Sequence, residues 1–157
     1  MNNDLDKTDL KILKILQENG RITNLQLSSE IGLSPAPTLE RVKKLEQAGV
    51  ITGYHAILDK KSMGIGLQAF MLVSLSGHKS TAIKKFVDDI SQIEEIVECY
   101  HVTGSGDHLL RIMVADIASY EKLVMDKIST LEGVAQMQTM IVLSWTKESR
   151  VLPVKYS

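Results

Sequence analysis

Three cationic side chains, Arg41, Lys43 and Lys44, lie close together in the first third of the chain. An arginine can pair with the edge of a guanine in the major groove of DNA, and lysines suit phosphate oxygens. The same residue types also form solvated helix faces that bind nothing, so their meaning depends on the elements that carry them. The chemistry that they suggest is contact with double-stranded DNA.

The cationic residues fall on the second of two predicted helices that are joined by a tight turn, within residues 23–45. Thr23 can cap the first helix, and Gly32 stands where the chain must leave that helix, a position that favours a positive φ. Ser34 is a second N-cap, followed by Pro35 at the first helical position, where its missing N–H costs nothing. This order of signals is typical of a helix-turn-helix.

The second helix of this pair has an inner and an outer side. Leu39, Val42 and Leu45 recur every third residue and predict the side that faces the core. At about 100° per residue, Pro37, Glu40, Arg41 and Lys44 point roughly the opposite way, with Lys43 beside them and Thr38 at the margin. The residues that we expect to contact DNA are Ser34, Pro37, Thr38, Arg41, Lys43 and Lys44.

A second group with chemical potential is the loop Thr103-Gly104-Ser105-Gly106-Asp107, between two predicted strands. Two glycines leave backbone N–H groups open to a carboxylate, as in an anion-binding nest, and the aspartate can take an ammonium group. An amino acid carries both of these charges. A glycine-bearing hairpin turn that binds nothing has the same composition, so the sequence leaves both interpretations open.

The histidines do not indicate a metal site or an enzyme. His55, His78, His101 and His108 show no metal-ligand spacing. The sequence also contains no nucleophile elbow, phosphate loop or paired acid–base signature. It therefore predicts no catalytic residue, no metal site and no cofactor.

The first half of the chain predicts a small helical domain. A helix over Lys7–Glu18, with Asp6 as its N-cap, completes a bundle of three helices. Residues Val50–Leu58 alternate and are rich in β-formers, which predicts a strand that serves as a wing or a linker. The polar and then glycine-rich segment Asp59–Gly66 predicts a hinge. We therefore place a DNA-binding domain with its linker strand at residues 1–62 and a second domain at residues 63–157.

The second half predicts the order strand, helix, strand, strand, helix, strand. The segments are Leu67–Leu75, Ser80–Ser91, Ile96–Val102, His108–Ala115, Ala118–Leu131 and Val134–Trp145. This order matches a ferredoxin-like βαββαβ plait, so the fold class is α+β. Both helices of such a plait cover one face of the sheet, yet the strands are nearly continuous apolar runs. We expect the bare face to pack on another copy, giving a symmetric dimer with two recognition helices.

Composition narrows the class of protein. The net charge is −1, which argues against a protein that coats nucleic acid non-specifically. No apolar run approaches the roughly 18 residues of a membrane span, so we expect no membrane partner. Cys99 is the only cysteine, which argues against a disulfide framework and favours the cytoplasm. We expect Cys99 to be a small buried residue and Trp145 to lie in the core or an interface.

Two sets of motifs occur in order along the chain. The first comprises Leu5-Asp6 with Asp9 and Ile12-Leu13, then Leu33-Ser34-Pro35 with Leu39-Glu40-Arg41-Val42 and Leu45-Glu46, and then Gly49-Val50-Ile51. The second comprises Glu98-Cys99-Tyr100-His101-Val102-Thr103-Gly104, Asp107-His108-Leu109-Leu110 and the downstream Tyr120. Together they resemble the Lrp/AsnC, or feast/famine, transcription regulators, and the resemblance covers essentially the whole chain.

The resemblance implies a winged helix-turn-helix that binds operator DNA and a ligand domain that senses amino acids. It also implies dimers, often rings of four dimers, that are associated with the nucleoid. The positions that match the effector-responsive sites of the family are His101, Asp107, Ile117, Met140, Ile141 and Val142. Since His101 and Met140 differ in type from the leucine responder, the resemblance leaves the effector open.

Two other functions use the same scaffold. Siroheme decarboxylases resemble this family in both domains and use histidines around a tetrapyrrole. Because His101 and His108 could serve in this way, an enzyme of this kind stays open as an alternative. A ligand-independent architectural protein is the other alternative. Its DNA affinity would fall steeply with salt concentration and would not depend on the DNA sequence.

Overall fold

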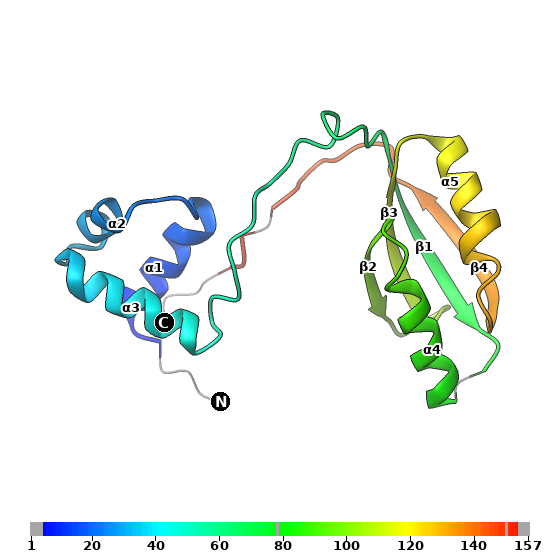
Figure 1. Ribbon diagram of the computed structural model, residues 1–157, viewed down its shortest axis with the longest axis horizontal. Coiled ribbons are helices and arrows are strands. Elements are labelled where there is room, and N and C mark those ends of the chain that lie inside the picture. Colours follow the sequence, from blue (N-terminus) through cyan, green and yellow to red (C-terminus); the bar gives the residue numbers. More distant parts are fainter. Residues whose placement is uncertain (1–4, 78, 150, 154–157) are drawn as a thin grey trace. The chain divides into compact units, whose positions relative to one another are not determined.

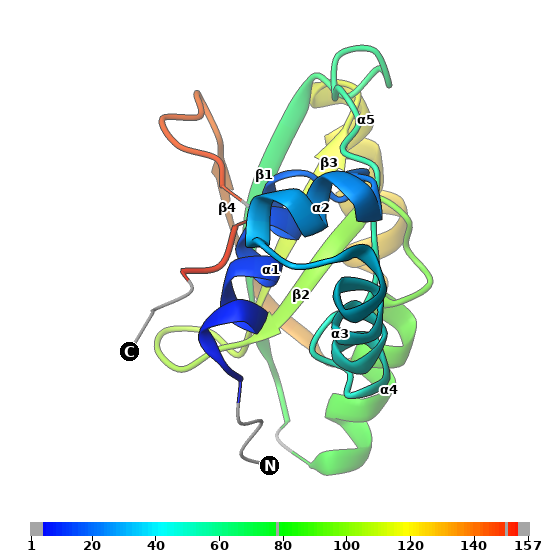
Figure 2. The ribbon, with the colours of Figure 1, turned by 90° about the vertical axis from the view of Figure 1, so that its left-hand side faces the viewer.

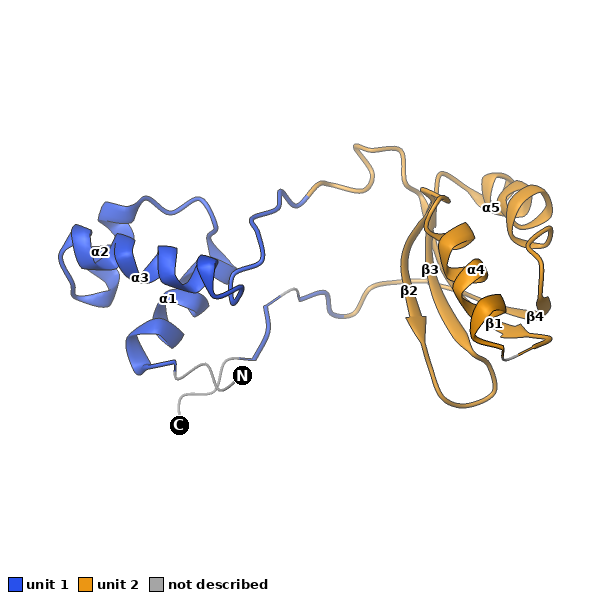
Figure 3. Cartoon of the chain, turned by 60° about the horizontal axis from the view of Figure 1, so that its bottom comes forward, with its two compact units in different colours: residues 1–57, 147–157 blue, residues 58–146 orange. Residues whose placement is uncertain are grey.

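The computed structural model describes residues 5–77, 79–149 and 151–153, and the chain divides into two compact units. One unit comprises residues 1–57 together with 147–157, and the other comprises residues 58–146 (Figure 3). The predicted boundary after residue 62 lies five residues further on. The last residues belong to the first unit because the Leu152 backbone pairs with the side-chain amide of Gln17, at 2.6 Å and 3.4 Å.

The first unit contains three helices, α1 (Lys7–Glu18), α2 (Asn24–Ile31) and α3 (Pro35–Gln47) (Figures 1 and 2). They enclose a small core in which Ile12, Leu27 and Leu45 are buried. The predicted range of the first helix and the helix-turn-helix order of the next two are confirmed.

Local signals set the limits of these helices. Asp6 caps α1 and Thr23 caps α2, each in a reciprocal capping box with the residue three positions later. Gly32 ends α2 with φ 75°, in the left-handed region that favours glycine. Ser34 takes the extended N-cap conformation before α3, but its side chain makes no capping hydrogen bond.

The inner side of α3 differs from the predicted stripe. Thr38 is fully buried and its hydroxyl donates to the Ser34 carbonyl at 2.9 Å, whereas Leu39 is 42% exposed. A three-residue repeat drifts by about 60° per step on a 3.6-residue helix, so Leu39 turns away while Thr38 stays in line with Leu45. The prediction that Thr38 lies on the DNA-facing margin is therefore wrong.

The predicted strand over residues 50–58 is also wrong, because the structure has no strand there. Within residues 5–77, 79–149 and 151–153, its alternating β-formers have no neighbouring strand with which to form a hydrogen-bonded ladder. Sequence alternation alone cannot supply that partner.

The second unit is a four-stranded antiparallel sheet with two helical segments, as predicted (Figure 1). Its order along the chain is βαββαβ, and its sheet order is β2-β3-β1-β4. The elements are β1 (Leu67–Leu75), α4 (Ser80–Ile90), β2 (Ile96–His101), β3 (His108–Val114), α5 (Ile117–Leu123), the π-helical turn η1 (Val124–Ile128) and β4 (Val134–Ile141). The last strand ends four residues before the predicted limit.

Both helices cover the same face of this sheet. Alternate residues of β1 and β3, such as Met71 and Leu110, are buried in one cluster with Phe86 of α4 and Leu123 of α5. The residues between them form the opposite face and are mostly only partly buried, for example Leu72 opposite Leu109, although Gln68 near the start of β1 is buried. This alternation differs from the sequence impression of two equally buried faces.

Cys99 is more exposed than predicted, and Trp145 lies outside the core, which leaves its predicted place in an interface open. Cys99 is exposed, because it lies on the edge strand β2. Trp145 is 50% exposed and lies beyond the end of β4, where the ammonium of Lys60 stands 4.5 Å from the ring centroid. None of the helices in the described part of the chain combines the length and the apolar character of a membrane span.

Candidate functional site

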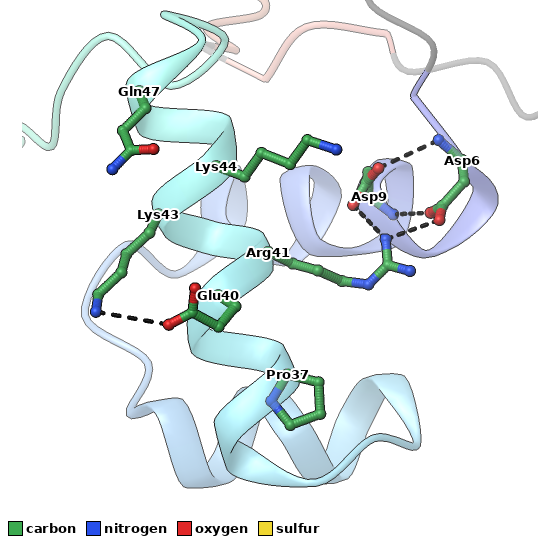
Figure 4. Close-up of a pocket in the computed structure, with 8 residues that line it drawn as sticks. All are labelled: Asp6, Asp9, Pro37, Glu40, Arg41, Lys43, Lys44 and Gln47. Carbon is green, nitrogen blue, oxygen red and sulfur yellow. Dashed lines mark hydrogen bonds and ion pairs between the residues drawn. The ribbon is translucent and has the colours of Figure 1, made fainter.

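An open groove of about 720 Å³ runs along the outer side of α3 (Figure 4). Cations and carboxylates from α3 and from the start of α1 line it together. The lining residues are Asp6, Asp9, Pro37, Glu40, Arg41, Lys43, Lys44 and Gln47.

Three of the predicted DNA-contact residues, Pro37, Lys43 and Lys44, are exposed on this groove. Ser34 is exposed at the N-terminus of α3, where unpaired N–H groups and the helix dipole favour an anion such as phosphate. Lys43 forms only a loose pair with Glu40, at 3.8 Å between two well-exposed side chains. Such a pair is weak and leaves the ammonium available.

Arg41 is held differently from the two lysines. Its Nη1 atom donates to Asp6 Oδ2 and to Asp9 Oδ1, both at 2.7 Å (Figure 4). The hydrogen bond with Asp6, and then that with Asp9, raises the pKa of Arg41. The Asp9 amide and then the Arg41 guanidinium lower the pKa of Asp6. The sequence analysis placed Asp6 as a helix cap but connected neither aspartate with Arg41, because they precede it by more than thirty residues.

The predicted ligand loop connects β2 to β3 and is fastened to β1. Val102 N donates to the Asp107 carbonyl, and Asp107 N donates to the Val73 carbonyl, both at 2.9 Å. The Asp107 carboxylate accepts the Leu75 amide at 2.7 Å. The aspartate that was predicted to bind an ammonium group thus also anchors its own loop.

The two glycines of this loop have different roles. Gly104 has φ 135°, a conformation that other residues rarely adopt. Gly106 is buried, and a Cβ added there would lie 2.5 Å from Leu72 Cγ. The loop therefore lies close against β1, while Thr103, Gly104 and Ser105 remain exposed.

The predicted effector residues fall into two groups at opposite ends of the sheet. His101 and the loop lie beside Val73, whereas Ile141 pairs with Ala69 and Val142 N donates to the Gln68 carbonyl. Four residues separate Val73 from Ala69, which is about 13 Å along a strand. The group at the second end consists of Ile117, Met140, Ile141 and Val142, and Ile117 is placed there because it follows the end of β3. One chain does not bring the two groups together.

Two histidine rings stack where the loop joins β2 and β3. His101 and His108 are cross-strand neighbours with their rings stacked 5.2 Å apart, and Phe86 lies 5.0 Å from His108. His108 is buried, and this burial, followed by the nearby His101, lowers its pKa. His55 is exposed in the first unit, and His78 lies outside the described residues. No group of three or more His, Cys, Asp or Glu side chains in the described ranges is arranged to hold a metal.

Known proteins match the chain over both units. A family model of winged helix-turn-helix DNA-binding domains matches residues 5–52, and one of the Lrp/AsnC ligand binding domain matches residues 68–152. The chain is 42% identical over 154 residues to the leucine-responsive regulatory protein of Haemophilus influenzae, covering 98% of this chain and 93% of that protein. It is 39% identical to the transcriptional regulator AzlB of Bacillus subtilis, over 96% of each chain.

A solved structure agrees with the fold of the whole chain. The crystal structure of a transcriptional regulator from Neisseria meningitidis in complex with L-Met has a TM-score of 0.92 at 41% identity, covering 95% of this chain and 96% of that one. These relatives are named as regulators rather than as enzymes. The helix-turn-helix of the first unit and the antiparallel plait of the second both match these regulators, and the chain therefore belongs to the Lrp/AsnC family of transcription regulators.

Proposed function

We propose that the protein binds double-stranded operator DNA through the outer face of α3, and that an amino acid changes its DNA affinity or its assembly. The observation that supports DNA binding is the groove along α3, in which Lys43 and Lys44 are exposed. This helix follows α2, which is capped by Thr23 and ends at Gly32, as the second helix of a helix-turn-helix does. A recognition helix in this position enters the major groove with its first turns toward the bases.

Each exposed residue on α3 has a distinct expected role. Ser34 and the first N–H groups of the helix bind phosphate, and the two lysines bind phosphates on either side of the groove. Pro37 faces the base edges from the first turn of the helix. The near-neutral charge of the whole chain means that specificity depends on these few placed groups.

The effector part is supported by the loop and by the relative that was solved with L-Met. The open N–H groups near Gly104 suit a carboxylate, and the acidic side chain of Asp107 suits an ammonium group. Because one chain separates the loop from Ile117 and Met140–Val142, we propose that a second copy supplies the other half of the site. A methionine-like amino acid is the first candidate.

Self-assembly follows from the sheet. The face without helices carries Phe70, Leu72 and Leu109 as partly buried side chains. We propose that this face joins two copies into a dimer, and that dimers assemble further into rings of four. The cytoplasm, with association to the nucleoid, is the proposed location.

The DNA-binding proposal is tested by selecting duplexes from a random pool with the full-length protein and measuring the affinity of the selected sequence by fluorescence anisotropy. We expect at least about a thousandfold preference over a scrambled duplex at physiological salt. Equal affinity for both duplexes, with a steep salt dependence, would instead identify an architectural protein.

The effector proposal is tested by repeating the titration with each common amino acid, L-Met first. Asp107→Asn keeps an acceptor oxygen for the Leu75 amide and removes the charge that an ammonium group needs. We expect this variant to bind operator normally and to lose its response to the amino acid. A normal response in Asp107→Asn would remove Asp107 from the effector site.

A further inference from the structure

We propose that Arg41 is a positioning residue, whose guanidinium clamps the recognition helix α3 to the N-terminal capping box of α1 and so supports DNA binding without touching a base. This inference rests on the proposed function and replaces our expectation that Arg41 reads a base edge. It also assigns Asp6 and Asp9, which lie on a different helix, to the DNA-binding machinery.

Each of the two carboxylates uses one oxygen in the capping box and the other oxygen to accept from Arg41. Asp6 Oδ1 accepts the Asp9 amide at 2.8 Å, and Asp9 Oδ2 accepts the Asp6 amide at 3.3 Å. The other oxygen of each carboxylate accepts from Arg41 Nη1, at 2.7 Å in both cases. The capping box therefore orients both carboxylates through hydrogen bonds that do not involve Arg41, and one nitrogen on α3 joins them.

Burial distinguishes this cluster from an ordinary surface ion pair. The Asp9 side chain is 16% exposed and that of Arg41 is 35% exposed, so water screens this pair only in part, whereas Asp6 is 50% exposed and its pair with Arg41 is screened more strongly. In contrast, Lys43 and Glu40 on the same groove are 52% and 76% exposed and stand 3.8 Å apart. The clamp is thus the ordered, pre-oriented charge cluster of this groove, and Lys43 with Glu40 is its natural control.

A base-reading role would require Arg41 to abandon these contacts. It would leave two adjacent carboxylates without their cation beside the DNA phosphates, where like charges repel. The partner atoms, Asp6 Oδ2 and Asp9 Oδ1, also hold Nη1 toward α1 rather than along the groove (Figure 4). The geometry therefore favours a role in holding α3.

The two roles predict opposite effects when the carboxylates lose their charge. In the double variant Asp6→Asn/Asp9→Asn, each asparagine keeps an oxygen for the capping hydrogen bond, so the start of α1 is preserved. If Arg41 reads a base, this variant frees the arginine and removes repulsion from DNA, and binding stays equal or tightens. If Arg41 is a clamp, α3 loses its anchor and operator binding weakens, by about tenfold.

The experiment measures operator and scrambled-duplex affinities of the full-length protein for the wild type, Asp6→Asn/Asp9→Asn, Arg41→Ala and the triple variant. We expect the double variant to bind the operator about tenfold more weakly, and Arg41→Ala to add little in its background, because both changes remove one interaction. Glu40→Gln, the control, removes a carboxylate from the same groove outside the clamp and should bind equally or more tightly. Unchanged or tighter binding by the double variant, or a fully additive effect of Arg41→Ala, would overturn the proposal.

Two further measurements keep this test decisive. Amide hydrogen exchange in α1 and α3 should rise in the double variant, and a variant that has unfolded is recognised by exchange across the whole first unit. Arg41→Lys, which keeps the charge but not the shared guanidinium, should then weaken operator binding evenly over all base pairs; a loss confined to one base pair would show base reading. Failure of the wild type to bind any selected duplex would refute the proposed function, whereas failure of the variants to differ would refute only the clamp.

Discussion

The folds of the two units are stabilised by different kinds of interaction. Among the described residues, the first unit buries three apolar side chains in its core and the second buries thirteen. In the first unit, α1 and α2 begin at capping boxes and α2 ends at a left-handed glycine, whereas the strands of the second unit are fixed by partners far away in the chain. Local signals thus define the first unit, and long-range packing defines the second.

The same difference separates the two candidate sites. The proposed DNA-contact surface is complete on α3 and the start of α1, within a single unit. The predicted effector residues are divided between two ends of one sheet, and one copy of the chain does not unite them. The outward residues of one helix can therefore be predicted in part from the sequence, whereas residues at two ends of a sheet form one site only with the second copy that we propose.

The largest expected effect comes from the core of the second unit. Phe86 is 1% exposed and packs in the cluster between α4 and the sheet. Phe86→Ala should lower the free energy of unfolding by about 3–5 kcal/mol. Peptide-level hydrogen exchange would measure this loss, and we expect it in residues 58–146 with residues 5–57 unchanged. Equal loss in both units would show that they unfold together and are not stabilised separately.

Two glycines provide a sharper comparison. Gly106 lacks a positive φ but has Leu72 Cγ 2.5 Å from the position of an added Cβ, whereas Gly32 has φ 75° and nothing within 4 Å. Gly106→Ala should cost about 1–3 kcal/mol through overpacking, and Leu72→Ala should relieve part of it. Gly32→Ala should cost about 1–2 kcal/mol through its backbone alone.

Urea denaturation of the single and double variants measures these free energies. Because no neighbour crowds Gly32, shortening the side chains around it should give no rescue of Gly32→Ala, and Gly32→Asn should be milder, since asparagine tolerates the left-handed region. Failure of Leu72→Ala to relieve Gly106→Ala would show that the glycine of the loop is required by its backbone and not by the approach of β1.

Some parts of the structure could be predicted from sequence and others could not, for the same physical reason. Asp6, Thr23 and Gly32 act on neighbours within four residues, so the helices that they limit were predicted closely. The inward position of Thr38 and the ion pairs of Arg41 depend on how the helices pack, so the sequence pattern placed Thr38 wrongly and did not indicate the two aspartates beside Arg41.

The sheet shows the same limit. The order of its elements was predictable because each has its own period, but the end of β4 at Ile141 was not, because the apolar run continues past the last residue that pairs with β1. The exposure of Cys99 likewise depends on β2 being an edge strand, which the sequence does not state.

The stability of the second unit should depend on pH through His108. Burial, and then the neighbouring His101, lowers the pKa of His108, so the unfolded chain binds a proton more readily than the folded one. The stabilising contribution of the neutral imidazole is present above the unfolded pKa of about 6.5 and is lost as the pH falls below it.

Thermal unfolding followed between pH 8 and pH 5 would measure this effect. We expect the melting temperature of the second unit to fall toward pH 5, and His108→Gln to flatten this dependence. His55→Gln, in the exposed segment of the first unit, is the control and should keep the wild-type slope. An unchanged slope in His108→Gln would assign the pH dependence to another group.

The smallest expected effect distinguishes the lysines of α3 from Arg41. Lys44 is exposed on the groove, so we expect it to bind a phosphate. Lys44→Gln should weaken binding to operator and to scrambled DNA alike, and should reduce the slope of log affinity against log salt by about 1. Arg41→Ala also removes a cation, yet its operator affinity should fall with little change in that slope, because its partners are Asp6 and Asp9 rather than phosphates. Equal changes of slope in both variants would mean that Arg41 also contacts the DNA backbone, and the recognition helix would then use all its cations in the same way.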